Sequence, residues 1–201
     1  MWIAHVPYDK SSGRLRQLYD RVKGPDDNVD NIMLAHSLRP HSMEGHMALY
    51  KYVLHHTANT VPKWFLETLG VYTSTLNGCA YCVEHHFAGL SRLVDDAIRA
   101  SEIRRALATD DFAIFDAGQR AALTYARALT RSPADEAALR SCVAAMRSAG
   151  LDDGAILEIN QVVAYFAYAN RTVLGLGVSM AGDVLGLSPG NSADPNDWSH
   201  R

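Results

Sequence analysis

The sequence predicts an all-α fold, and two observations carry this prediction. Apolar residues recur at helical spacing along the whole chain, while the period-2 alternation typical of β-strands is almost absent. The chain has 201 residues, 48% of them hydrophobic and 20% charged, which suits one domain with a substantial core. We therefore expect a single helical domain over residues 1–187 and a tail over residues 188–201 that is disordered or docks on another subunit.

Helix start and stop signals divide this domain. Residues 1–11 look extended, and Gly24 and Pro25 end the first predicted helix. Asn77 and Gly78 form a stop signal, and Asp116 with Gln119 resembles a capping box. In chain order, we expect helices over residues 12–23, 31–37, 40–54, 64–76, 80–91, 95–109, 121–130, 133–149 and 153–181.

The charge pattern argues against several partners. The formal net charge is −3 and no basic stripe is present, so we expect neither nucleic acid nor an anionic membrane as partner. The longest strongly apolar stretch, residues 162–169, is far shorter than the roughly 18 residues of a membrane span. The first residues lack the basic and apolar regions of a secretory signal. We expect a cytoplasmic protein.

Two of the three cysteines form a Cys-x-x-Cys pair, Cys79 and Cys82, and His86 follows four residues later. At about 100° per residue, these three side chains share a helix face within an arc of roughly 60°. In a reducing compartment such a pair is more often redox-active or metal-binding than a structural disulfide. The start of a helix also favours the thiolate form that sulfur chemistry requires.

A carboxylate completes this candidate site. If the helices on either side of Asn77 and Gly78 form an antiparallel hairpin, Glu67 lies opposite His86. Glu67 would then hold the tautomer of His86, and His86 would exchange a proton with Cys82. An i, i+3 pair on a regular helix keeps its β-carbons about 5 to 6 Å apart, so we expect a distorted helix start if the sulfurs are to join.

These residues resemble a known family. Glu67, the segment 77–82 (Asn-Gly-Cys-Ala-Tyr-Cys) and the pair His85 and His86 are similar to the signature of AhpD-like alkylhydroperoxidases, within the carboxymuconolactone decarboxylase superfamily. Segments 37–40 (Ser-Leu-Arg-Pro) and 163–171 (Val-Ala-Tyr-Phe-Ala-Tyr-Ala-Asn-Arg) resemble its longer "peroxidase-related" branch. The resemblance covers roughly residues 1–185.

The resemblance implies an AhpD-like helical bundle, homo-oligomers, and antioxidant reduction of hydroperoxides by a dithiol cycle of peroxiredoxin type. Cys82 would be the peroxidatic sulfur, Cys79 the resolving sulfur, and Glu67 with His86 the proton relay. An external thiol or dithiol protein would return the electrons, and we expect no cofactor and no metal. The chain departs from the best-characterised branch at Tyr81, which replaces a histidine and which we expect to be a packing residue pointing away from the sulfurs.

Four other interpretations stay open. Cys79, Cys82 and His86 with a further histidine (His55, His56 or His85) could hold a metal ion. The cysteines could simply fill a core. The superfamily also contains lactone decarboxylases that need no cysteine pair. A thiol sensor without turnover is the fourth possibility.

Two further expectations concern the surroundings of the thiols. Trp64, Phe65 and Phe87 could form an apolar wall beside the sulfurs, although core packing explains them equally well. Arg171 interrupts a helix that is apolar on most sides, so we expect it to be buried and paired with a carboxylate or with helix carbonyls.

Overall fold

The computed structural model describes residues 1–200, and over this range the regular secondary structure is helical. An isolated antiparallel bridge pairs Pro189 with His200. Two short 3-10 turns, Tyr8–Lys10 and Pro25–Asp27, accompany the α-helices. The α-helices are α1 (Gly13–Val22), α2 (Asn31–Leu34), α3 (Pro40–Leu54), α4 (Lys63–Leu76), α5 (Ala80–Val94), α6 (Ala97–Thr109), α7 (Ala117–Arg131), α8 (Glu136–Ser148) and α9 (Asp153–Leu176). The predicted all-α fold is confirmed.

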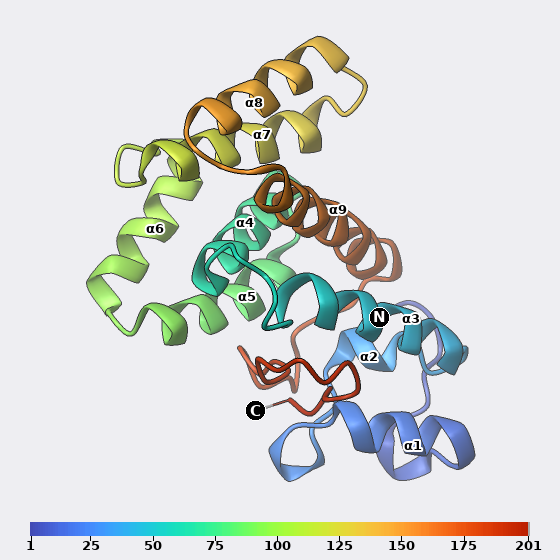
Figure 1. Ribbon diagram of the computed structural model, residues 1–201. Coiled ribbons are helices and arrows are strands. Elements are labelled where there is room, and N and C mark those ends of the chain that lie inside the picture. Colours follow the sequence, from blue (N-terminus) through green and yellow to red (C-terminus); the bar gives the residue numbers. More distant parts are fainter. Residues whose placement is uncertain (201) are drawn as a thin grey trace.

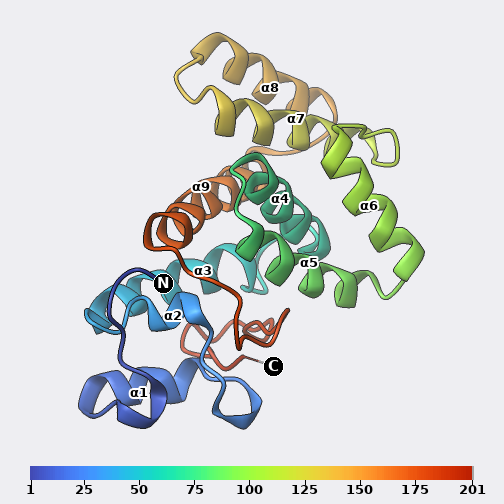
Figure 2. The same ribbon diagram turned by 180° about the vertical axis from the view of Figure 1, so that it is seen from behind.

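The centre of the molecule is the hairpin of α4 and α5, with α9 packed across α4 (Figure 1). The pair α7 and α8 lies at one end of the molecule, and α1 lies at the other, as both views show (Figure 2). Most buried apolar side chains form one core, whereas Cys79 and Cys82 belong to a second, smaller cluster with Ala35, Tyr81, Val173 and Val178. The thiols therefore sit beside the main core.

The predicted stop signal at Asn77 and Gly78 is confirmed in detail. Gly78 has a φ of +70°, and its N–H donates to the carbonyl of Thr75, while the N–H of Cys79 donates to the carbonyl of Ser74. These are the two hydrogen bonds of a Schellman motif, which satisfies the last carbonyls of α4. The turn reverses the chain within a few residues, so that α5 runs back along α4.

The long helix α9 ends earlier than the sequence predicts. Its last residue is Leu176, and Gly177 adopts a left-handed φ of +61° instead of continuing the helix to residue 181. A β-carbon on Gly177 would lie 2.4 Å from the Trp2 ring, so both backbone conformation and space require glycine there. The predicted capping box before α7 is confirmed, with both reciprocal hydrogen bonds of Asp116 and Gln119 present.

The tail that follows α9 packs on its own chain. Trp198 is buried, and the Arg21 guanidinium stacks over its ring at 3.7 Å. The Lys51 ammonium group of α3 donates to Ser192 at 2.9 Å. Arg201 lies outside the described residues. Within residues 1–200, no helix is both long and apolar enough to cross a bilayer.

Candidate active site

The thiol pair sits where α5 begins. Cys79 is the N-cap residue of α5, with a non-helical ψ of 85°, and Cys82 lies in the first turn. The two free sulfurs are 3.1 Å apart and both are buried. The sequence predicts that the start of the helix must distort before the sulfurs can join. No such distortion is needed, because Cys79 precedes the helix and its backbone already turns the side chain towards Cys82.

The two thiols share one hydrogen bond, which separates their acidities. The bond from Cys82 lowers the pKa of Cys79 to about 7, whereas its bond to Cys79 and burial raise the pKa of Cys82. With both thiols protonated, Cys79 donates to Cys82, and once one thiol is ionised the remaining proton can lie on either sulfur. We assign the low pKa to the pair: one of the two sulfurs ionises readily, because the other keeps its proton and donates it to the thiolate, and the second ionisation is disfavoured.

Asn170 of α9 supports this pair, and the sequence analysis missed its role. Its buried amide donates to Ser74 at 3.0 Å and accepts from Asn77 at 2.9 Å, and hydrogen bonding by Asn170 lowers the pKa of both thiols. Arg171 donates to the helix carbonyl of Ala167, as expected, but it is exposed, so the expectation that it is buried was wrong. Helical phase was the available signal, since Asn170 follows the buried Phe166 by four residues.

Glu67 and His86 form the pair that the hairpin predicts. The Glu67 carboxylate and Nδ1 of His86 are 2.7 Å apart, and the Glu67 side chain is only 3% exposed. Such a buried carboxylate needs a partner, and the imidazole supplies it. No hydrogen bond joins His86 to either sulfur within residues 1–200. Proton exchange between His86 and Cys82 would therefore pass through the space that both side chains line.

That space is a cavity of about 40 Å³ between α5, α9 and the N-terminal segments. Its wall contains Cys82 but not Cys79, so only one sulfur faces the interior. Trp64, Phe65 and Phe87 do not line the cavity; they pack in or against the core, which was the alternative interpretation of these residues. Tyrosines line the cavity instead, and Tyr50 stacks on Tyr165 at 5.4 Å. The lining side chains are Asp30, Ile32, Met33, His46, Tyr50, Glu67, Tyr81, Cys82, His85, His86, Tyr165, Ala169, Leu187, Ser188 and His200.

Tyr81 is buried as expected but does more than pack. Its hydroxyl donates to Asp183 at 2.7 Å and accepts from the N–H of Ile32, and its ring stacks on His85 at 4.4 Å. His85 also approaches Asp183, at 3.2 Å. Asp30 lies beside them, and burial raises its pKa to about 6. Sequence reasoning singled out neither aspartate, because neither stands in a motif.

The cysteine metal site considered from the sequence is not assembled. Within residues 1–200, the group of possible metal ligands whose atoms lie within 4.8 Å of one another is Asp30, His85 and Asp183. His55 is fully buried, and neither ring nitrogen has a hydrogen-bond partner. Burial lowers its pKa far below the usual value, so His55 is neutral. It ends α3 as a packed ring against Tyr50.

Solved structures carry the same helical arrangement. The "alkylhydroperoxidase AhpD core" protein of Ralstonia eutropha JMP134, described as an uncharacterized peroxidase-related protein, is 24% identical, with 83% of each chain covered and a TM-score of 0.67. The chain has the AhpD-like fold. A second peroxidase-related protein, from Silicibacter sp. TM1040, is 23% identical, with 89% of this chain and 88% of that chain covered and a TM-score of 0.67.

The AhpD-like fold also includes an enzyme with a stated substrate class. The debrominase Bmp8, solved in its apo form and, as a variant, with 2,3,4-tribromopyrrole, is 18% identical, with 83% of each chain covered and a TM-score of 0.62. No protein-family model and no curated protein matches the chain. At these identities the structural likeness establishes the fold, and the chemistry has to be argued from the site.

Proposed function

We propose that this protein is a thiol-dependent peroxidase that reduces organic hydroperoxides or hydrogen peroxide with the dithiol of Cys79 and Cys82. One observation carries the proposal: two free sulfurs 3.1 Å apart, one facing a small cavity that also contains a buried carboxylate and imidazole pair. A thiolate, a partner thiol and a proton carrier are the groups that peroxide reduction requires.

The cycle begins on Cys82, the sulfur that faces the cavity. When the shared proton lies on Cys79, the Cys82 thiolate attacks the terminal oxygen of the hydroperoxide. The O–O bond breaks, Cys82 becomes a sulfenic acid, and the departing alkoxide takes a proton through His86 to leave as an alcohol. Glu67 fixes the Nδ1 side of His86 and leaves Nε2 for this transfer.

Cys79 completes the oxidation. Its sulfur attacks the sulfenic sulfur, the hydroxyl group leaves as water, and a disulfide forms; the two electrons taken by the peroxide have come from the two thiols. An external thiol or dithiol protein then reduces the disulfide. We propose that the protein acts in the cytoplasm and that it forms a homo-oligomer, the latter as the family resemblance implies.

Reductive dehalogenation is a second candidate, favoured by the tyrosine wall and by the debrominase of the same fold. The rings of Tyr50, Tyr81 and Tyr165 line the cavity and could pack on a flat aromatic substrate, which the cavity of about 40 Å³ would have to widen to admit. The same two electrons would convert an aryl bromide into the arene and bromide, with a disulfide on the protein. Both candidates therefore depend on Cys82, and the substrate distinguishes them.

The deciding experiment measures consumption of cumene hydroperoxide, tert-butyl hydroperoxide and hydrogen peroxide by purified protein with a dithiol reductant. Bromide release from 2,3,4-tribromopyrrole is followed in parallel. We expect Cys82→Ser to abolish peroxide turnover and Cys79→Ser to stop it after one oxidation. The matched control is Cys142→Ser. Cys142 is a half-buried thiol on α8, outside the Cys79 and Cys82 pair, and its variant should retain full activity.

The rival interpretations give different results. Bromide release without peroxide consumption would replace the peroxidase by the dehalogenase. Turnover of a lactone that survives alkylation of both thiols would indicate a decarboxylase-like enzyme instead. Free, titratable thiols with no turnover at all would contradict the proposal and favour a sensor.

A further inference from the structure

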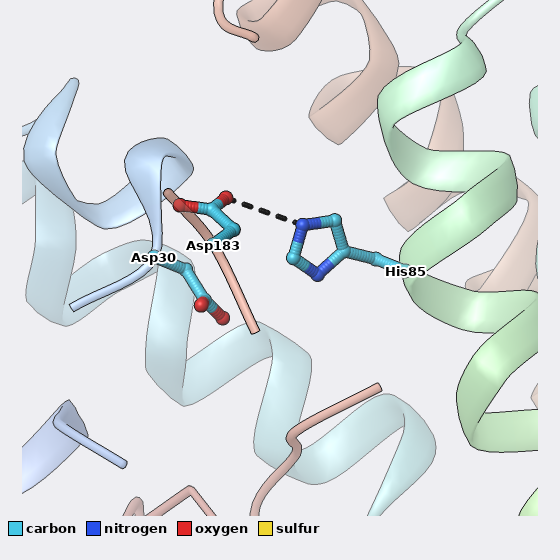
Figure 3. Close-up of side chains that lie close together, drawn as sticks. All are labelled: Asp30, His85 and Asp183. Atoms are coloured by element: carbon cyan, nitrogen blue, oxygen red, sulfur yellow. Dashed lines mark hydrogen bonds and ion pairs between the residues drawn. The ribbon is translucent and has the colours of Figure 1, made fainter. Parts of the chain in front are cut away.

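A second cluster of ionisable groups lies beside the thiol site and takes no part in the proposed cycle. Asp30 precedes α2, His85 lies on α5, and Asp183 lies in the segment after α9, so three distant parts of the chain converge (Figure 3). One possible ligand atom from each residue lies within 4.8 Å of the other two. All three side chains are buried: Asp30 and His85 are each 8% exposed, and the Asp183 side chain is 1% exposed.

The charges of this cluster are unbalanced. Two carboxylates face a single imidazole, and no lysine or arginine forms an ion pair with either carboxylate within residues 1–200. Like charges this close, away from water, repel each other strongly. A cation between them would remove the repulsion.

Asp30 supplies an independent sign that the cluster is incomplete. One of its carboxylate oxygens accepts from the side chain of Asn28 at 3.1 Å. The other oxygen accepts no hydrogen bond within residues 1–200, although the residue is more than nine-tenths buried. The oxygen itself is not fully buried, because Asp30 lines the cavity, so it is open to a ligand there. This one belongs to a side chain that converges on His85 and Asp183 and lines the cavity.

The geometry suits a metal ion. The His85 nitrogen and the Asp183 oxygen are 3.2 Å apart. Two atoms bound to the same ion at about 2.0 to 2.2 Å lie roughly 3 Å apart, so these two could become ligands with little movement. Tyr81 and the N–H of Asn31 already donate to the Asp183 carboxylate, and such outer contacts orient a ligating carboxylate.

We propose that Asp30, His85 and Asp183 form a binding site for a divalent first-row metal ion, next to the cavity that contains Cys82. One imidazole nitrogen and two carboxylate oxygens form a donor set that suits ions such as Mn²⁺, Fe²⁺ or Zn²⁺. Three protein ligands leave further coordination positions for water or for an oxygen atom of a molecule in the cavity. This site replaces the initial expectation of no metal, and it uses none of the cysteines.

Mn²⁺ is the most selective probe, because it prefers oxygen and nitrogen ligands to thiolates. Metal-free, reduced protein is titrated with Mn²⁺, and the free ion is measured by electron paramagnetic resonance. We expect one equivalent to bind. Asp30→Asn, which keeps the shape of the side chain, should weaken binding at least tenfold, and His85→Gln should do the same.

Two controls make the result specific. Glu84→Gln removes a neighbouring carboxylate on α5 that pairs with Arg104 on the outside, and it should leave Mn²⁺ affinity unchanged. The double variant Cys79→Ser, Cys82→Ser should also bind normally. Circular dichroism checks that each variant is folded, and His85→Gln carries the test if Asp30→Asn does not fold. The proposal is overturned if wild-type protein binds no Mn²⁺, if folded ligand variants bind as wild type does, or if binding disappears with the thiols.

Discussion

Two adjacent histidines on α5 belong to two different halves of the site: His86 to the thiol half with Glu67, and His85 to the aspartate half with Asp183. His86 is held by Glu67, a residue of the neighbouring helix in the same hairpin, only 19 positions away in sequence. His85 is held by Asp183, which lies 98 positions away in the segment after α9. One half therefore depends on a local turn, whereas the other depends on how the chain end returns to the middle of the molecule. We expect the first half to set turnover and the second to set metal binding.

The largest expected effect is a difference in peroxidase activity between variants of His86 and variants of His85. His86→Gln and Glu67→Gln remove the proton carrier or its orienting partner, and acid-base groups of this kind contribute about 10² to 10⁴ in rate. We expect kcat/KM for cumene hydroperoxide to fall at least a hundredfold in both. His85→Gln, assayed without added metal, should lose less than tenfold. Equal losses at positions 85 and 86 would contradict the division into two halves.

The pH dependence of thiol alkylation tests only the half of the site that contains the two cysteines. The pKa of Cys79 is lowered to about 7 by its hydrogen bond with Cys82, against about 8.5 for an ordinary thiol. Alkylation by iodoacetamide should therefore fall about tenfold for each pH unit below 7 and level off above it. Because the folded pKa is the lower one, thiolate formation stabilises the reduced protein: the gain grows between about pH 7 and 8.5, is complete above about 8.5, and is lost as the pH falls through 7.

Two variants test the cause of the lowered Cys79 pKa. In Cys82→Ser a hydroxyl replaces the donating thiol, so part of the lowering should remain. In Cys82→Ala no donor is left, so the lowering should disappear. The remaining thiol of Cys82→Ala should titrate close to the ordinary value. If the midpoint stays near 7 in that variant, the hydrogen bond between the sulfurs is not the cause of the lowered pKa.

Asn170→Ala should have a smaller and mixed effect. The change leaves the Ser74 hydroxyl and the Asn77 amide without their buried partner, which costs about 1 to 3 kcal/mol of folding free energy. It also removes a group that lowers the pKa of both thiols, so the alkylation midpoint should rise. Asn160→Ala on the same helix, which breaks a hydrogen bond to Tyr125, should destabilise the fold and leave the midpoint unchanged.

The pairing of Glu67 with His86 could be predicted because local signals determine it. Asn77 and Gly78 end one helix, the next helix begins at once, and helical geometry then sets which residues face each other across the hairpin. The expected helix begins at residue 80, as observed, but the closeness of the sulfurs was harder to predict, because helical spacing of the β-carbons does not apply to the non-helical N-cap residue Cys79. If residue 79 were helical the two sulfurs would be held apart, whereas its non-helical backbone lets them come into contact.

Asp30 and Asp183 could not be predicted because no periodic pattern links the segments that carry them. The path after α9 depends on Gly177 stopping the helix and on tertiary contacts such as that between Lys51 and Ser192. For a similar reason, the sequence could not decide whether Trp64, Phe65 and Phe87 line the cavity or pack in the core. Phe65 has an apolar side chain suitable for a pocket, but the docking of other helices turns it into the core, where it packs on Phe115.

The smallest expected effect concerns Tyr81, which joins the two halves through α5. Tyr81→Phe removes the hydroxyl that donates to Asp183 and accepts from the N–H of Ile32, while it keeps the ring that stacks on His85. A hydrogen bond of this kind contributes about 0.5 to 1.5 kcal/mol, and we expect a loss of that size in chemical denaturation. Peroxide turnover should change less than threefold, because neither sulfur bonds to the hydroxyl, whereas Mn²⁺ affinity should fall because Asp183 is less firmly oriented. A large loss of turnover with unchanged Mn²⁺ binding would show instead that the hydroxyl acts within the thiol half.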